Sequence, residues 1–271
     1  MIKKYYITGD AHGDFSRFKN LPKEVQQDPE VAIIILGDAG LNWTLDEHDA
    51  QIKNMLSKKY AFTIYCVRGN HEARPSDVHD MLLEYDHDVG AHVWQQKKWP
   101  RIKYFKDFGI YHFGNYRTAV IGGAYSVDKW YRLERGYRWF ENEQLSPDEM
   151  RDCKFYFNTA ISNKFDFVLT HTCPISWEPR DLFLASIDQS KVDKSTEIFL
   201  EEMKDELDWS VWLFGHHHDD RLVRPHVEMF YNDIDKLDDI MENWQKYDKT
   251  GQVDWWLKKD PWFYTEEKKK N

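Results

Sequence analysis

Short apolar runs alternate along the chain with longer, more polar stretches. Five runs are rich in β-branched or aromatic residues and are bounded by polar segments, which is typical of buried β-strands. Between the second and third runs, residues 45–59 have the composition of a helix, as do residues 197–207. This alternation predicts an α/β architecture with a largely buried sheet. The five predicted strands lie at 5–7, 31–36, 61–67, 165–169 and 211–214.

The middle and the end of the chain have a different pattern. Residues 110–113 and 118–121 flank a Gly-Asn turn, which predicts a β-hairpin. Residues 124–160 lack a clean period, so we expect an excursion from the core that forms a lid. We expect a short strand near 226–231, a helix near 235–247, and an aromatic-rich C-terminal extension over 232–271. Because no repeat or linker interrupts the sequence, we expect a single domain over residues 1–271.

Composition and charge exclude several classes of protein. The chain is 41% hydrophobic and 31% charged, as in globular proteins, and its net charge is −10. A negative surface repels a phosphate backbone, which argues against duplex nucleic acid as a partner. No run approaches the ~20 apolar residues of a membrane span, and the three cysteines form no CxxC pair. We therefore expect a cytoplasmic protein with no membrane partner; its oligomeric state is not predicted.

Polar side chains follow each of the five predicted strands. In open α/β sheets, ligands bind outside the carboxyl ends of the strands, so these side chains should gather at one edge. Each motif alone is also compatible with a turn or a surface histidine, but their joint position at strand ends favours a binding site. The side chains are Asp10 and His12, then Asp38, then Asn70, then His171, and finally His216 and His218.

Spacing within each motif suggests how the side chains point. In an extended segment, side chains two apart face the same way, so Asp10 and His12 should face one ion. The same spacing predicts that His216 and His218 share a direction while His217 points elsewhere. Oxygen and nitrogen ligands without a thiolate suit Mn, Fe, Zn, Ni or Co better than Ca. The residue types therefore predict a transition-metal site.

Taken together, the motifs resemble those of the calcineurin-like metallophosphoesterase superfamily. Its pattern is Asp-x-His, Gly-Asp, Gly-Asn-His-Glu, a lone His after a strand, and Gly-His-x-His, and all five occur here in order between Asp10 and His218. The resemblance implies two mixed β-sheets packed as a sandwich and flanked by helices. It also implies a hydrolase of phosphate esters that uses two divalent metal ions, for which we expect Mn²⁺, with Fe, Zn, Ni or Co as alternatives.

The resemblance also implies a role for each motif residue. His71 corresponds to the catalytic histidine that is not a ligand and that stabilises or protonates the leaving group, while Asp38 bridges the two ions. His217 occupies the variable position of the last motif and is not expected to be a ligand. The implied ligands of the first ion are Asp10, His12 and His218, and those of the second are Asn70, His171 and His216.

General chemistry explains why these residue types suit the reaction. Two ions about 3.5–4 Å apart clamp the attacking and departing oxygens of an in-line displacement, and they generate a bridging hydroxide near neutral pH. The carboxylate of Asp38 offsets the repulsion between the ions. His71 has an ordinary pKa of about 6.5, which suits an acid near neutrality. Glu72 either orients that imidazole or a metal ligand, or lies at a helix N-terminus, and both readings remain open.

One departure from the pattern affects how phosphate is bound. The phosphoprotein phosphatase branch and its dinucleotide-hydrolysing relatives read Gly-Asp-x-x-Asp-Arg-Gly at the second motif, whereas residues 37–43 here lack that arginine. Arg74 follows the third motif and is one candidate replacement. Arg132 and Trp130 are others, in a segment similar to the Gly-Gly-Ala-x-Ser segment of some bacterial and phage members.

The same segment bears on the substrate. Aromatic faces stack on bases and arginines fork onto phosphates, so a lid over residues 124–140 predicts a phosphorylated small molecule, a nucleotide or a short nucleic-acid end. A packed surface excursion is the alternative for this segment. Other functions that remain open are a serine/threonine-type phosphoprotein phosphatase and a non-catalytic metal-binding scaffold. The presence of His71 and of every implied ligand favours the enzyme.

Overall fold

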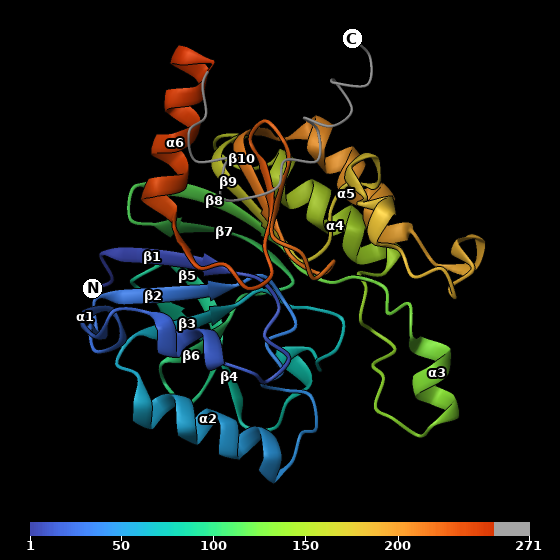
Figure 1. The fold of residues 1–271 in the computed structure, drawn as a ribbon, viewed down its shortest axis with the longest axis horizontal. Helices are drawn as coiled ribbons and strands as arrows, with labels where there is room; N and C mark the ends of the chain where they lie inside the picture. Colours follow the sequence, from blue (N-terminus) through green and yellow to red (C-terminus); the bar gives the residue numbers. More distant parts are fainter. Residues whose placement is uncertain (252–271) are drawn as a thin grey trace.

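Two β-sheets pack face to face, and helices cover their outer sides (Figure 1). This arrangement, seen in a computed structural model that describes residues 1–251, confirms the predicted sandwich of two mixed sheets. The end of the predicted C-terminal extension, with Trp255, Trp256 and Trp262, lies outside the described residues. Within residues 1–251, no helix has both the length and the apolar character that a membrane crossing requires.

The first sheet has seven strands in the order β13-β1-β2-β3-β6-β5-β4. Strands β1, β2, β3 and β6 are parallel, whereas β13, β5 and β4 each pair in the antiparallel sense. The sequence patterns missed β4–β6; β4 begins with the apolar Met81, Leu82 and Leu83, but most of its side chains are exposed, so it does not follow the pattern of a buried strand. The bounds are β1 Lys4–Thr8, β2 Val31–Ile35, β3 Thr63–Cys66, β4 Met81–Asp86, β5 Ala91–Gln96, β6 Ile102–Tyr104 and β13 Asp235–Lys236.

The second sheet has six strands in the order β11-β12-β10-β9-β8-β7. Strands β8, β9, β10 and β12 run parallel to their neighbours in this group, and β7 and β11 add antiparallel edges. The predicted hairpin is confirmed as β7 and β8, which turn at Gly114 with a φ of 63°. The bounds are β7 Phe108–Phe113, β8 Tyr116–Ile121, β9 Lys164–Thr170, β10 Asp208–Phe214, β11 Arg221–Arg224 and β12 Val227–Met229.

Helices cover both outer faces, so the central strands are buried on two sides. Strand β2 is buried at every position, with Ile34 between the sheets and Ile33 toward the outer helices. In Figure 1, α2 lies along the outer face of the first sheet, and α4 and α5 lie against the second. The helices are α1 Lys23–Gln26, α2 Glu47–Lys59, α3 Lys129–Glu134, α4 Pro147–Asn158, α5 Ser195–Glu206 and α6 Leu237–Thr250.

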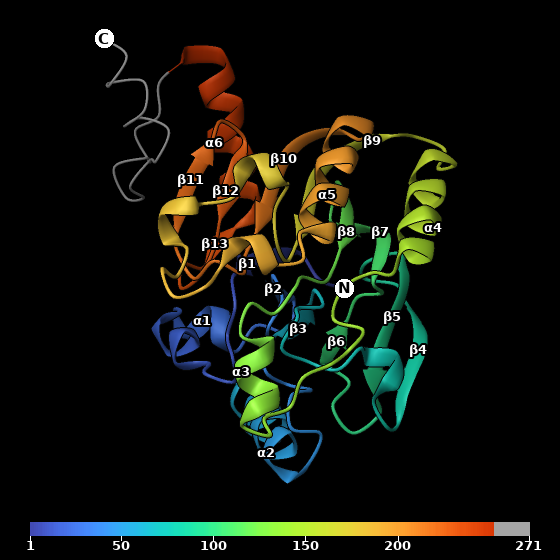
Figure 2. The same cartoon turned by 90° about the vertical axis from the view of Figure 1, so that its right-hand side faces the viewer.

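The segment 124–160 is only partly the excursion that its sequence suggests. Helix α3 projects from the body of the molecule in Figure 1 and faces the viewer in Figure 2. Helix α4 instead belongs to the core, where Phe157 is fully buried and its ring centroid lies 5.7 Å from that of Phe165. Phe155 and Tyr156 are apolar but exposed, so the sequence of α4 does not show a clear helical period of buried apolar residues.

We expect Phe157→Ala to destabilise the protein strongly. Truncating a buried phenylalanine typically costs about 3–5 kcal/mol, because the surrounding side chains do not collapse into the cavity. Phe155→Ala is the matched control, since that ring is 71% exposed, and it should change stability by less than about 0.5 kcal/mol. Urea unfolding measures both. Similar losses in the two variants would show that α4 does not pack as described.

Candidate metal centre

The loops that follow five strands meet at one edge of the sandwich. They leave the carboxyl ends of β1, β2 and β3 in the first sheet and of β9 and β10 in the second. Side-chain oxygens tie the loops together, because His71 N donates to Asp38 Oδ1 at 2.8 Å and His216 N donates to Asp10 Oδ1 at 2.9 Å. Each carboxylate therefore accepts a backbone hydrogen bond through Oδ1, while its Oδ2 faces the histidines of the cluster.

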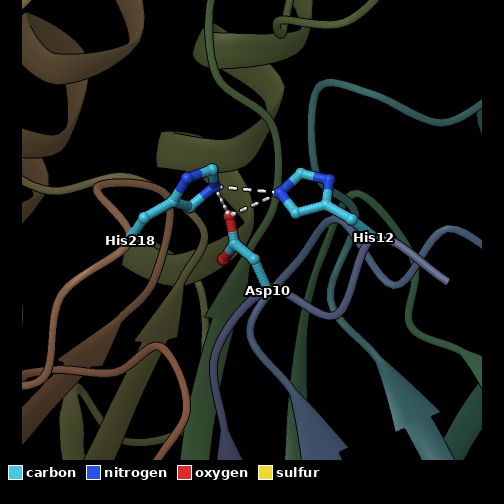
Figure 3. A group of neighbouring side chains, drawn as sticks. All are labelled: Asp10, His12 and His218. Carbon is cyan, nitrogen blue, oxygen red and sulfur yellow. Dashed lines mark hydrogen bonds and ion pairs between the residues drawn. The ribbon is translucent and has the colours of Figure 1, made fainter. Parts of the chain in front are cut away.

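The first group contains Asp10, His12 and His218 (Figure 3). Asp10 Oδ2 lies 3.2 Å from His218 Nε2 and 3.7 Å from His12 Nε2, and the two imidazole nitrogens are 2.9 Å apart. Asp10 Oδ2 is buried and has no hydrogen-bond partner among the described residues. One carboxylate oxygen and two imidazole nitrogens that converge in this way fit a transition-metal ion.

The second group lies around His171. His171 Nδ1 is 2.7 Å from the carbonyl oxygen of Leu36, which places the ring proton on Nδ1 and leaves Nε2 as an acceptor. Nε2 then faces another acceptor, Asn70 Oδ1, at 2.8 Å, and lies 3.6 Å from Asp38 Oδ2. Acceptors that face one another need a cation or an added proton between them. The ring of His216 lies 4.9 Å from that of His171 and completes this side.

The contacts of Asn70 explain why its oxygen faces His171. Asn70 Nδ2 donates to Ser126 Oγ at 2.8 Å, and Ser126 Oγ donates to Glu143 Oε2 at 2.5 Å. Ser126 N also donates to Glu143 Oε1 at 3.0 Å. These hydrogen bonds fix the orientation of the Asn70 carboxamide. The sequence analysis missed Glu143, which no local pattern distinguishes from the other acidic residues.

Four of the cluster residues have backbone conformations that side chains rarely adopt. The φ angles are 46° at His12, 44° at Asp38, 69° at His216 and 55° at His218. Such conformations cost of order 1–3 kcal/mol each and concentrate at functional sites. They also correct one expectation, because His216 and His218 do not share a direction as they would in an extended strand. His216 lies beside His171, whereas His218 lies beside Asp10.

Two glycines allow the loops to approach the carboxylates. A Cβ added at Gly69 would lie 2.0 Å from Asp38 Oδ1, and one at Gly215 would lie 2.5 Å from Asp10 Oδ1. Neither distance is possible for a real side chain. These two positions therefore need glycine for close packing against the ligands rather than for a turn.

The cluster concentrates buried negative charge. Asp10 and Asp38 are each 1% exposed, and within residues 1–251 neither forms an ion pair with Lys or Arg. Burial favours the neutral acid, but His71 and His171 hold the pKa of Asp38 well below its usual value. Burial lowers the pKa of His171, yet Asp38 and Asp10 outweigh it and raise that pKa to about 9. A bound cation would replace this proton as the compensating charge.

Glu72 supports the loop of a proposed metal ligand rather than an imidazole. It is 4% exposed and accepts hydrogen bonds from the backbone N–H groups of Ala39, Leu41 and Asn42 at 2.7–3.3 Å. Burial and the nearby Asp38 raise the pKa of Glu72 to about 7. Glu72 thus holds the loop that follows Asp38 and keeps the Asp38 carboxylate, the expected bridge between the ions, in place.

His71 lies at the edge of the cluster. Its Nδ1 is 3.6 Å from Asp38 Oδ2, and its Nε2 is 3.4 Å from Asp128 Oδ1. Arg132 Nη2 lies 3.2 Å from His71 Nδ1, and Arg132 Nε donates to Asp128 Oδ2 at 2.7 Å. Burial opposes protonation of His71, but Asp38 and Asp128 outweigh it and raise its pKa. The sequence analysis did not assign Asp128 a role.

The remaining substrate candidates lie away from the cluster. Arg74 bonds to Glu149, to Asp107 and to backbone carbonyl groups, including that of Gln144 at 2.8 Å. This contact set holds α4 and the preceding loop, so we do not propose Arg74 as a phosphate ligand. Trp130 is 68% exposed on α3. Of the three candidates, only Arg132 contacts the cluster residues.

A cavity of about 400 Å³ opens beside the cluster. Asp38, Asn70, His216 and His218 line one side, and residues 182–192 contribute a mostly apolar wall. His217 belongs to this wall rather than to a ligand group, because its Nε2 lies 3.6 Å from Cys173 Sγ and its ring stacks on Phe183. The cavity has the size of a small-molecule site.

The chain matches one protein family by sequence and is similar in structure to several known proteins. The sequence model of the calcineurin-like phosphoesterases matches residues 3–220. Phosphopantetheinyl hydrolase from Mycobacterium tuberculosis is similar over 93% of this chain and 94% of its own, at 10% identity and a TM-score of 0.42. A protein of unknown function from Aquifex aeolicus is similar over 62% and 80%, at 13% identity and a TM-score of 0.30. No curated protein sequence matches the chain.

We expect Asp38→Asn to lower both metal content and activity. The substitution removes the buried charge that two of the three candidate ligand groups share. Losing a contact even outside the ligand set typically weakens metal affinity by about 10–100-fold, so the loss here should be at least as large. Elemental analysis after dialysis against Mn²⁺ measures it, with the exposed Asp80→Asn as control. A variant with two bound ions and near-normal hydrolysis of a chromogenic phosphate ester would refute the bridging role.

Proposed function

The chain belongs to the calcineurin-like phosphoesterase family of hydrolases, and on that basis we propose that it hydrolyses phosphate esters at a centre of two divalent ions. The observation that carries the proposal is the position of Asp38. Its carboxylate belongs both to a group with His12 and His71 and to a group with Asp10 and His171, so it lies beside candidate ligands of both ions. A carboxylate in that position suits a bridge between two cations.

The chemistry of the donor set supports the choice of metal. Asp10, His12 and His218 would hold one ion, and Asn70, His171 and His216 the other, with Asp38 between them. Carboxylate, carboxamide and imidazole ligands without a thiolate suit Mn²⁺, which we propose as the native metal. When bound, such ions supply Lewis-acid activation of water and neutralise charge on the phosphoryl group.

We propose that His71 protonates the departing oxygen of the ester. Its ring is at the mouth of the cluster, and Asp128 on one side and Asp38 on the other favour the charged form. Arg132 lies beside the ring and would bind a phosphate oxygen, which supplies the arginine that the second motif lacks. Asp128 would orient both side chains, because its carboxylate faces His71 and accepts from Arg132.

The substrate that we propose is a phosphorylated small molecule, and a nucleotide is one such molecule. The cavity of about 400 Å³ beside the cluster supports a substrate of this size. Arg132 supports a phosphate contact, whereas the exposed Trp130 does not line the cavity and adds no support for base stacking there.

We expect His71→Ala to lose activity while it keeps its metal. Truncating a general acid typically costs about 10²–10⁴-fold in rate. The loss should be smaller for 4-nitrophenyl phosphate than for phenyl phosphate, because a good leaving group needs little protonation. Steady-state rates and metal content measure both effects, with the 93% exposed His79→Ala as control. Parallel loss of metal and activity would make His71 a ligand instead.

Two variants separate the roles of Arg132 and Trp130. Arg132→Ala should lower kcat/KM by about 10–100-fold on both a nucleotide and a small aryl phosphate, because it removes a charge-assisted hydrogen bond to the phosphate that they share. Trp130→Ala should leave both substrates within about twofold, as is usual for an exposed side chain. A selective loss on the nucleotide in Trp130→Ala would mean that α3 closes over the base as a lid.

A further inference from the structure

The cavity beside the cluster has two chemically different ends. One end consists of the proposed ligands and His71, and the other is a mostly aliphatic and aromatic wall that also includes the polar Gln189 and Lys194. Leu184 in this wall is 61% exposed and Val127, which also lines the cavity, is 37% exposed, so part of the apolar lining is open to solvent. Apolar groups gathered in a concave site are typical of a ligand pocket. The wall contains Leu182, Phe183, Leu184, Ile187 and Val192.

A buried carboxyl group lies in the same cavity lining. Glu197, in the first turn of α5, is 4% exposed, and its Oε1 accepts from Thr172 Oγ1 at 3.0 Å. Its Oε2 is buried and has no hydrogen-bond partner among the described residues. The nearest cation, Lys194, is engaged elsewhere, because its Nζ lies 2.6 Å from Glu178 and 4.8 Å from the centroid of the Phe183 ring.

A buried acceptor without a hydrogen-bond partner is costly unless a ligand supplies a donor. A buried polar atom without a partner loses its hydration and gains nothing in return. Burial raises the pKa of Glu197 to about 7, against the lowering effect of its hydrogen bonds and of Lys194. No packing role explains Oε2, since the Thr172 contact uses the other oxygen. A ligand donor in the cavity would satisfy it.

We propose that this cavity binds the organic group of the ester, and that this group is a ring-sized apolar moiety with one N–H or O–H donor that Glu197 accepts. The inference rests on the proposed function, since the phosphoryl group would lie at the end formed by the proposed ligands and His71. A sugar phosphate without an aromatic group does not fit, because it would leave the aliphatic and aromatic side chains of the wall uncovered. A phenol and an aminopurine both have the required chemistry, and the experiment distinguishes them.

The first test uses matched esters that differ only in the donor. One arm compares naphthyl phosphate with the monophosphates of the isomeric naphthalenediols, and the other compares purine riboside monophosphate with adenosine monophosphate. We expect the donor-bearing member of at least one arm to have a kcat/KM about 10–100-fold higher, the usual effect of a hydrogen bond to a charged group. The arm that responds identifies an aryl or a nucleobase ligand. Equal values in both arms would overturn the proposal.

Variants of Glu197 test the acceptor itself. Glu197→Met introduces a side chain of similar bulk without an acceptor. The ratio of kcat/KM between the donor-bearing ester and its partner should therefore fall to about 1, while metal content is unchanged. Binding of the free naphthalenediols and of naphthol to wild-type protein, measured by calorimetry, needs no variant and remains decisive if Glu197→Met fails to fold. Tighter binding of at least one diol is expected in that measurement. A preference that survives in Glu197→Met would assign the donor contact to another residue and overturn the proposal.

Two isoleucines test the apolar wall. Ile187→Ser changes a cavity residue, whereas Ile198→Ser makes the same change next to Glu197 at a position that is 49% exposed. Ile187→Ser should raise KM for naphthyl phosphate by about 10-fold or more, as the loss of apolar contacts in a pocket usually does, with kcat little changed. Ile198→Ser should leave KM unchanged. Equal effects of the two substitutions would contradict a binding role for the wall.

The results also separate this inference from the proposed function. If the Mn²⁺-loaded protein hydrolyses none of the esters but binds a naphthalenediol more tightly than naphthol, the proposed function fails and the pocket stands. If it hydrolyses every ester without discrimination, the proposed function stands and the pocket fails.

Discussion

Two buried carboxylates without a lysine or arginine partner determine how the active edge of this molecule is built. Asp10 and Asp38 are each 1% exposed, and in the described part of the chain they form ion pairs with histidines alone. Charges buried in this way are stable only when paired or when they coordinate a metal. Without an ion, the imidazole of His171 takes a proton instead, which its pKa of about 9 records. The demand for positive charge at this edge therefore explains both the electrostatics of the cluster and its suitability for metals.

The rest of the structure holds those carboxylates in place at the cost of backbone strain. Left-handed backbone conformations at four cluster residues and close loop packing at Gly69 and Gly215 store strain that the sheets must sustain. Glu72 accepts three backbone hydrogen bonds from the loop after Asp38, and Glu143 fixes Asn70 through Ser126. The buried strands on two faces supply the rigidity that such a site needs.

Local signals in the sequence predict the central strands and the cluster, whereas the two-sheet sandwich was expected from the family resemblance. Apolar runs mark the central strands, and the motifs follow directly after them. The supporting contacts are different, because Asn70 and Ser126 lie 56 residues apart and Ser126 and Glu143 lie 17 apart, so no local pattern joins them. The spacing rule for extended segments also gave the wrong direction for the His216 side chain, because that rule does not apply to a residue with positive φ. The cavity wall comes from short 3-10 turns around residues 180–191, which have no periodic signal.

The central claim is that Asp38 lies between two metal ions with separate ligand sets. Anomalous diffraction from crystals grown with Mn²⁺ tests it most directly, since the ions themselves produce the signal. The account predicts two peaks about 3.5–4 Å apart, one beside Asp10, His12 and His218, the other beside Asn70, His171 and His216, with Asp38 contacting both. A single peak, or a second ion bound through His71 and Asp128, would contradict it.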